Sequence, residues 1–332
     1  MKALARVRNP YTGFAIFALL VMALPLVVTN QYYLGVLVVI VIHSIIVLGL
    51  DLLMGYTGQI SLGHASFYGL GAYITGVLSA HWQWPPLAGL AVALPVVAVI
   101  AWLIGMPTLK LHGHYLAMAT LGFGIIVFIF FNELGKFTGG PSGLTGIEEM
   151  NLFGLTFASD REWYYLSTAF LLAVLLLSIN VVRSRVGRAL RAIHGSEAAS
   201  GVLGVNISRY KVGIFVLSAL YAALAGWLYA HYITFISPSS FTFMFSVKLV
   251  TMVVVGSLGS LWGAIFGAAL LTSLPEILYV FHNYETLVFG IILIVVMIFM
   301  PRGLLRGIDD LIKHLWHLGL RSLSGTPEEG PS

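Results

Sequence analysis

Four polar side chains lie close together in an apolar part of the sequence. Asp51, Gln59, Ser61 and His64 surround segment 55–63, where glycines interrupt the apolar pattern. Polar groups are costly at membrane depth, so they usually face a pathway or a partner. Two interpretations follow: these side chains line a gate, or they satisfy backbone groups exposed by a helix break. The candidate gate consists of these four polar residues, two glycines that let the chain bend, and one phenylalanine. Its residues are Asp51, Gly58, Gln59, Ser61, Gly63, His64 and Phe67.

A second candidate site is a basic loop. Residues 183–211 carry six Lys or Arg residues against one acid, Glu197. Residues 187–200 can form a short helix with Leu190 and Ile193 on one side and arginines on the other. Such a helix fits a cleft on a partner protein, and a basic loop beside anionic lipid is the alternative. The candidate coupling residues are Arg185, Gly187, Arg188, Leu190, Arg191, Ile193 and Glu197.

The sequence offers little other chemistry. It contains no cysteine, which excludes disulfides, thiolate metal sites and thiol nucleophiles. It has no Gly-x-x-x-x-Gly-Lys-Ser/Thr motif, so we predict that it does not bind ATP through a P-loop. We predict no catalytic residue, no metal site and no cofactor within this chain. Glu276, which follows Pro275, is the best candidate for proton coupling.

Membrane-spanning helices must hold these residues. Of 332 residues, 59% are hydrophobic and 9% are charged, whereas soluble domains carry ~25% charged residues. This composition excludes a soluble globular enzyme, a disordered chain and a typical nucleic-acid binder. Apolar runs suited to crossing ~30 Å of hydrocarbon occur at 13–29, 34–50, 60–80, 86–106, 115–132, 163–182, 212–233 and 286–300.

Charge indicates which side of the membrane each connection faces, because basic flanks stay in the cytoplasm. The N-terminus, 1–12, and the loop 183–211 are basic and are predicted to be cytoplasmic. The loop 133–162 carries two basic residues against five acidic ones and is predicted to be periplasmic. Between them lies a transmembrane domain, 13–302. Residues 303–332 are predicted to form a cytoplasmic amphipathic helix and a polar tail.

The apolar stretch 247–278 decides the number of crossings. Gly256, Gly259, Gly263 and Pro275 interrupt it, as expected for discontinuous or re-entrant helices that line an enclosed path. If it forms two short spans, the chain crosses ten times; if it forms a re-entrant pair, eight is the alternative. We therefore predict an all-α, polytopic transmembrane bundle with broken helices.

Small residues recur at helical spacing. Gly259, Gly263 and Gly267 follow one another every four residues. Small residues on one helical face let backbones approach closely within lipid. We expect tight helix packing here, with dimer contacts or surfaces that slide during gating as the alternative.

Several stretches resemble one transporter family. Residues 50–77, beginning LDLLMGYTGQISLGHASFYGLGAY, resemble the signature of branched-chain amino acid ABC importer permeases. The similarity continues in family order through 109–124, 138–147 and 184–211, and it covers about 45–305. It is closest to the larger of the two permeases that these importers pair. The sequence departs from the family pattern at His114, Ile125 and His194.

The resemblance implies a subunit of an importer in the bacterial inner membrane. Its partners would be a second homologous permease, two cytoplasmic ATPases that bind ATP and magnesium, and an external solute-binding protein. The loop 183–211 would then couple to the ATPases. The alternatives are a related importer of urea, amides or other small solutes, an ion-coupled secondary transporter, and an intramembrane enzyme. The last is disfavoured because no catalytic set clusters in the sequence.

Overall fold

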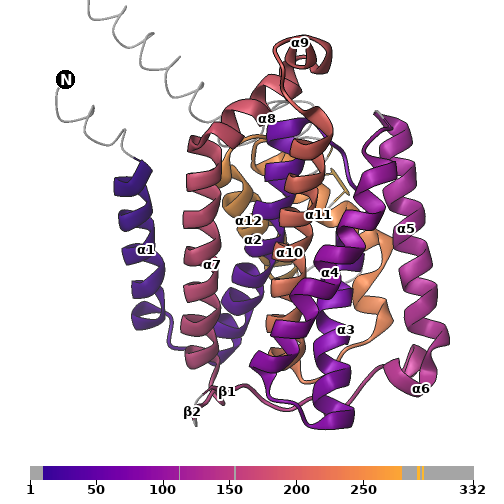
Figure 1. Cartoon of the computed structure of the whole chain (residues 1–332). Coiled ribbons are helices and arrows are strands. Elements are labelled where there is room, and N and C mark those ends of the chain that lie inside the picture. The colour runs from indigo at the N-terminus through magenta and orange to yellow at the C-terminus, as the bar shows by residue number, and fades with distance from the viewer. Residues whose placement is uncertain (1–9, 112, 153–154, 279–289, 292–293, 295–332) are drawn as a thin grey trace, which may run out of the picture.

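The structure, a computed structural model, describes residues 10–278 except 112 and 153–154, together with 290–291 and 294. Over these residues the chain forms twelve α-helices, two short 3₁₀ helices and one two-stranded antiparallel sheet. In chain order these are α1 (Pro10–Val27), α2 (Gln31–Thr57), α3 (His64–Trp82), α4 (Pro86–Thr108), α5 (His114–Glu133), α6 (Gly135–Thr138), η2 (Gly140–Ser142), β1 (Asn151–Leu152), β2 (Leu155–Thr156), α7 (Asp160–Arg183), α8 (Arg185–Gly195), α9 (Glu197–Val202), α10 (Ile207–Ile233), η3 (Pro238–Phe241), α11 (Phe243–Gly256) and α12 (Leu261–Leu278). The long helices run between two ends of the molecule, one with α8 and α9 and the other with β1 and β2 (Figure 1).

The helical class of the fold is confirmed. Five helices, α2, α4, α5, α7 and α10, are long and apolar enough to cross a membrane, and α1, α11 and α12 contain shorter apolar helices. The number of crossings stays a prediction. The predicted amphipathic helix at 303–318 lies outside the described residues, as does all of the run 286–300 except 290, 291 and 294.

Helix α2 forms the centre of the bundle. Apolar residues are spread around most of its circumference, so other helices must cover it on several sides, and α7, α10, α11 and α12 do so. Every residue from 45 to 53 is buried. This burial fixes the end of α2, which leads directly into the candidate gate.

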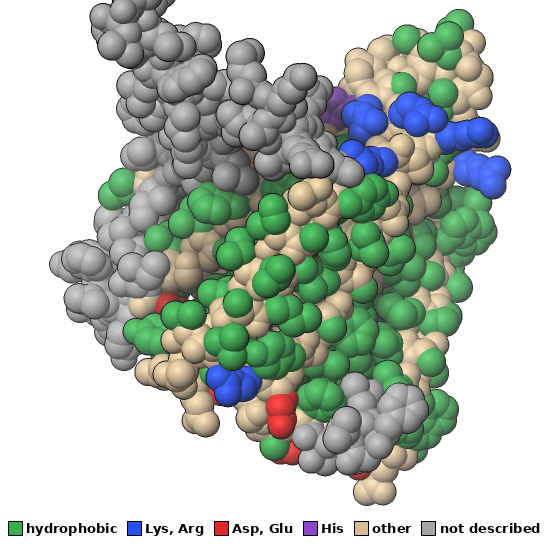
Figure 2. Space-filling view, turned by 90° about the vertical axis from the view of Figure 1, so that its left-hand side faces the viewer, with side chains coloured by type: hydrophobic (Ala, Val, Ile, Leu, Met, Phe, Trp, Pro, Cys, Tyr) green, Lys and Arg blue, Asp and Glu red, His purple; other side chains and the backbone are tan. Residues whose placement is uncertain are grey.

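The outer helices expose apolar surface instead. Leu19 and Leu20 of α1 are 73% and 64% exposed, and Ile126 of α5 is 67% exposed. In Figure 2 one side of the molecule is hydrophobic over most of its height. Basic side chains gather toward the end with α8 and α9, and acidic ones lie at the opposite end. Exposed apolar surface over several helices is the expected surface of a protein surrounded by lipid.

Glycines allow close contact between α11 and α12, which form a hairpin. A Cβ on Gly267 would overlap the carbonyl of Met252, and one on Gly263 would lie 2.6 Å from the carbonyl of Gly256. The expectation that Gly263 and Pro275 interrupt the helix was wrong, since both lie inside α12. The chain turns at 257–260 instead, because Gly263 serves a close helix contact and the turn uses Gly259, at φ 70°.

Candidate functional site

The candidate gate lies where α2 ends and α3 begins. Residues 58–63 between them are not helical. Gly58 ends α2 in the left-handed region, at φ 70°, and its amide donates to the Met54 carbonyl at 3.0 Å. Glycine is favoured here because side chains rarely adopt this conformation. The break is thus narrower than the predicted 55–63, since α2 continues through Thr57.

Side chains from distant helices hold the broken segment. The Thr120 hydroxyl of α5 accepts from the Leu62 amide at 3.0 Å, and the Ser246 hydroxyl of α11 accepts from the Ala65 amide at 3.1 Å. Both side chains are buried. They satisfy amides that a broken helix leaves without partners. Sequence reasoning missed this role of Thr120 and Ser246, although small hydroxyl residues within apolar helices were a usable signal.

His64 connects the break to α10. Its Nδ1 lies 3.0 Å from the Ser61 hydroxyl and its Nε2 lies 2.6 Å from the Ser218 hydroxyl. The side chain is fully buried. In either neutral tautomer one ring nitrogen donates and the other accepts, and a serine hydroxyl can match both. The structure therefore brings Ser61 and His64 together, as the sequence suggested, and adds Ser218 as their partner.

Aromatic rings surround this histidine. The Phe67 ring centroid lies 5.1 Å from that of Phe123 and 5.5 Å from that of Phe215. The His64 ring meets Phe67 edge-on at 5.9 Å. Nearby, the Gln59 side chain donates to the Thr57 carbonyl at 3.3 Å. The polar groups of the break are thus neutral, and His64 and Phe67 are packed within a buried aromatic cluster.

Asp51 lies apart from the histidine network. Its Oδ1 accepts a hydrogen bond of 2.7 Å from the Gly259 amide, in the turn between α11 and α12. The side chain is fully buried. A Cβ on Gly55 would overlap both the Gly259 backbone and the Asp51 carboxylate. Asp51 therefore joins α2 to the turn between α11 and α12.

Helix α8 lies across the ends of α2, α7 and α10. Its apolar side is buried, with Leu190 and Ile193 0% and 2% exposed, whereas Arg185 and Arg188 are exposed. The geometry matches the predicted two-sided helix, although 187–200 forms parts of two helices, α8 and α9, and not one. Arg191 is exposed and donates to the Val182 carbonyl at 3.1 Å, at the end of α7. A Cβ on Gly187 would overlap that same carbonyl, so the residue must be small.

The far end of α8 meets the broken segment. A Cβ built on Gly58 would lie 3.2 Å from Nδ1 of His194. The histidine ring therefore rests on the backbone that begins the break. This contact was not predicted, because 136 positions, most of them in other helices, separate the two residues in the sequence.

Helix α9 projects beyond the bundle at this end (Figure 1). Glu197, at its start, pairs with the buried Lys211 of α10, with Oε1 and Nζ 2.5 Å apart. Val202 and Leu203 at its tip are 88% and 81% exposed. Large apolar side chains this exposed are typical of a protein contact surface.

Glu276 lies toward the opposite end, outside this network. Its carboxylate accepts a hydrogen bond from the Tyr32 hydroxyl, at the start of α2. Glu276 is exposed and borders an open cavity of about 360 Å³ with Asp160 and Thr272. This position gives no support to the idea of a buried proton relay.

Comparison with known proteins agrees with this architecture. Residues 32–297 match the family described as branched-chain amino acid transport system, permease component. The chain is 37% identical to the high-affinity branched-chain amino acid transport system permease protein LivM of Salmonella typhimurium, over 80% of this chain and 68% of that protein. The LivM protein of Escherichia coli is 36% identical over the same shares. The LivH permease of Escherichia coli is 27% identical, over 79% of this chain and 91% of its own length.

No solved structure matches the chain significantly. The family match spans α2 to α12, and so includes the break, its hydroxyl partners and α8. The chain belongs to the permease component family of branched-chain amino acid transport systems.

Proposed function

We propose that this chain is the larger permease subunit of an ATP-driven importer of branched-chain amino acids. The observation that carries the substrate class is the match of residues 32–297 to the branched-chain amino acid permease family. The similarity to LivM supports the same class. A test is needed, because the fructose import permease FrcC of Rhizobium meliloti is also 24% identical over 76% of this chain.

The sidedness is part of the proposal. The α8–α9 end faces the cytoplasm with both termini, and loop 133–162 faces the periplasm of a bacterium, across its inner membrane. Basic side chains near α8 (Figure 2) support this orientation. We propose ten crossings, counting α11 and α12 as two short spans.

Partner subunits complete the transporter. The permease family lacks the ATPase site, so ATP and magnesium bind to other chains. Two cytoplasmic ATPases, a second homologous permease and an external solute-binding protein are the proposed partners. The exposed side of α8, with Arg185 and Arg188, and the apolar tip of α9, with Val202 and Leu203, form the docking surface for an ATPase.

The geometry supports a direct route from this surface to the gate. Leu190 and Ile193 are buried on the bundle side of α8, so the helix moves with the helix ends beneath it. His194 rests on Gly58, the first residue of the break. A displacement of α8 by the ATPase would therefore reach the break without passing through a flexible loop.

The test is purification and reconstitution. The tagged chain, with every subunit that co-purifies from its native membrane, is placed in vesicles and assayed for ATP-driven uptake of labelled leucine, fructose and urea. We expect leucine uptake, and loss of the ATPases with Arg185→Glu/Arg188→Glu. Lys110→Glu, an exposed charge reversal away from α8, is the matched control.

The alternative functions give different results. If the vesicles take up urea or fructose but not leucine, the chain carries a different class of substrate within the same family. Transport by the chain alone under an ion gradient, abolished by Glu276→Gln and unaffected by the arginine changes, would overturn the ATP-driven proposal.

A further inference from the structure

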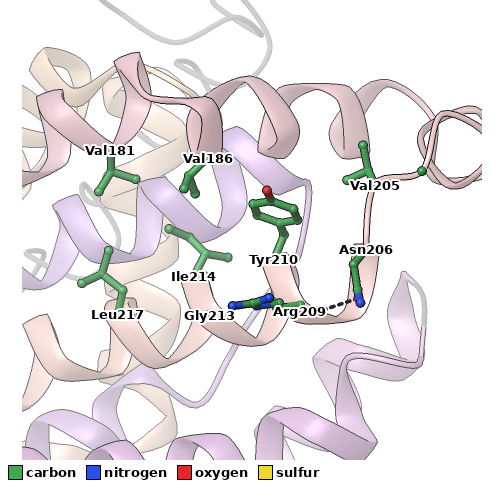
Figure 3. A pocket seen from close by; sticks show the side chains of 10 residues that line it. Val181, Val186, Val205, Asn206, Arg209, Tyr210, Gly213, Ile214 and Leu217 are labelled. Atoms are coloured by element: carbon green, nitrogen blue, oxygen red, sulfur yellow. Dashed lines mark hydrogen bonds between the residues drawn. The ribbon is translucent and has the colours of Figure 1, made fainter.

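Two open grooves lie side by side on the outward face of α10, at the end of the bundle near α8. One, of about 640 Å³, is bordered by α7 and α8 (Figure 3). The other, of about 660 Å³, is bordered by α4. Asn206, Arg209 and Gly213 line both grooves. A single arginine thus stands between two hollows of similar size.

Most of the wall of each groove is apolar. Val181, Ile214 and Leu217 line the first, and Trp102, Met106, Val212 and Val216 line the second. From Arg209 to Leu217 the grooves follow α10 for about 12 Å, at 1.5 Å per residue. Apolar channels of this length, open to the surroundings of the bundle, suit hydrocarbon chains better than water.

The shared arginine supplies a positive charge beside both grooves. Arg209 is exposed, and its backbone amide donates to the Asn206 side chain. In the described part of the chain its guanidinium has no ion pair and no hydrogen-bond acceptor. Figure 3 shows the Arg209 and Tyr210 side chains turned into the first groove from α10. A guanidinium pairs with phosphate through two parallel hydrogen bonds.

Gly213 makes the arrangement possible. A Cβ at this position would meet nothing within 4 Å, although Gly213 lies in the middle of a helix. The absence of a side chain therefore creates open space just beyond the arginine, on both sides of it. Internal contacts do not require this glycine, in contrast to Gly226 on the same helix, whose Cβ would overlap the Tyr68 carbonyl.

We propose that this face binds a two-chain anionic phospholipid. The phosphate sits on the Arg209 guanidinium and one acyl chain lies in each groove, so that the lipid straddles α10. Charge complementarity selects this occupant over a protein segment, because within the described residues the guanidinium is unpaired and stands beside two mainly apolar grooves. The inference uses the sidedness proposed above, since Arg209 then lies at the cytoplasmic leaflet, where anionic lipids attract basic side chains.

Trp102 allows a direct test, because it lines the second groove and is 45% exposed. The intact complex is reconstituted in phosphatidylcholine vesicles that contain a minority of phosphatidylglycerol. Bromine is placed on the acyl chains of one lipid or the other, because brominated chains quench tryptophan on contact. The fluorescence of Trp102 is obtained as the difference between the tryptophan emission of the complex and that of its Trp102→Phe variant.

We expect phosphatidylglycerol to quench Trp102 about fivefold more efficiently per molecule than phosphatidylcholine does, the effect of one basic side chain near an anionic lipid. Arg209→Gln should abolish the preference, and Gly213→Leu should reduce quenching by both lipids. Lys110→Gln removes an exposed charge outside the grooves and should change neither.

Equal quenching by the two lipids would overturn the proposal. A preference that survives Arg209→Gln would do the same, as would a Trp102 signal that neither lipid quenches, which would mean that protein covers the groove. Leucine uptake in the same vesicles separates the two proposals. If uptake persists while the lipid preference fails, only the lipid site is wrong.

Discussion

Replacing His64 with leucine tests whether the histidine network is structural or part of the gate. His64 is fully buried between the Ser61 and Ser218 hydroxyls. Leucine has a similar volume, so the cavity contribution is small. Ser61 keeps a long contact, 3.5 Å, from the Gly63 amide, but Ser218 loses its hydrogen bond of 2.6 Å to the His64 ring. A buried polar group left without a partner costs about 1–3 kcal/mol, which we expect as the loss of stability in His64→Leu.

A second substitution separates the two roles. Ser218→Ala removes the hydroxyl that His64→Leu leaves without a partner, so the double variant should regain most of the lost stability. The measured coupling between the two sites should then be about 0.5–3 kcal/mol. Stability is followed as the thermal midpoint of the purified complex, and function as ATP-driven leucine uptake.

The two measurements distinguish the interpretations. If His64 only satisfies its neighbours, stability and uptake return together in His64→Leu/Ser218→Ala. If it belongs to the gate, stability returns and uptake does not. A His64→Leu complex as stable and as active as the unchanged one would refute the reasoning, because the network would then contribute to neither property.

Three further predictions follow from the packing. Gly267→Leu forces a side chain into the α11–α12 contact and should abolish recovery of the monodisperse complex by size-exclusion chromatography. Gly122→Leu, at a position with nothing within 4 Å of a Cβ, should leave that recovery unchanged. Asp51→Ala removes the acceptor at the α11–α12 turn and should lower stability by about 1–3 kcal/mol, whereas Asp51→Asn keeps an acceptor and should lower it less; thermal unfolding of both variants checks this. Glu197→Ala leaves the buried Lys211 ammonium without this partner and should lower the thermal midpoint more than Glu197→Ala/Lys211→Met does. A double variant less stable than the single one would contradict that account.

The sequence allowed the helices to be located but not their lateral contacts. Each apolar run up to residue 233 corresponds to a helix, because a bilayer imposes a length and a composition that are visible locally. The break near Gly58 was predictable for the same reason, since polar residues and glycines interrupt an apolar run. The bonds from Thr120 and Ser246 to this break were not predictable, because they join residues 58 and 181 positions apart.

The prediction of helix breaks from glycine was wrong at one position and right at another. Gly259 turns the chain with φ 70°, whereas Gly263 sits inside α12 against the Gly256 carbonyl. In the sequence the two glycines look alike, because either role requires only that a side chain be absent. The face that a neighbouring helix occupies decides between them, and that face is a property of the folded bundle.

The central position of α2 has a consequence for biosynthesis. The buried Asp51 carboxylate accepts a hydrogen bond from Gly259, which lies 208 positions later in the chain. At about 5–20 residues per second, a ribosome needs about 10–40 s to make that partner. During this interval α2 is already long enough to insert, yet its carboxylate lacks the hydrogen bond from the Gly259 amide. Chains that stop before Gly259 would lack this bond to a buried carboxylate, so the environment of Asp51 in α2 is completed only when the turn between α11 and α12 has been made.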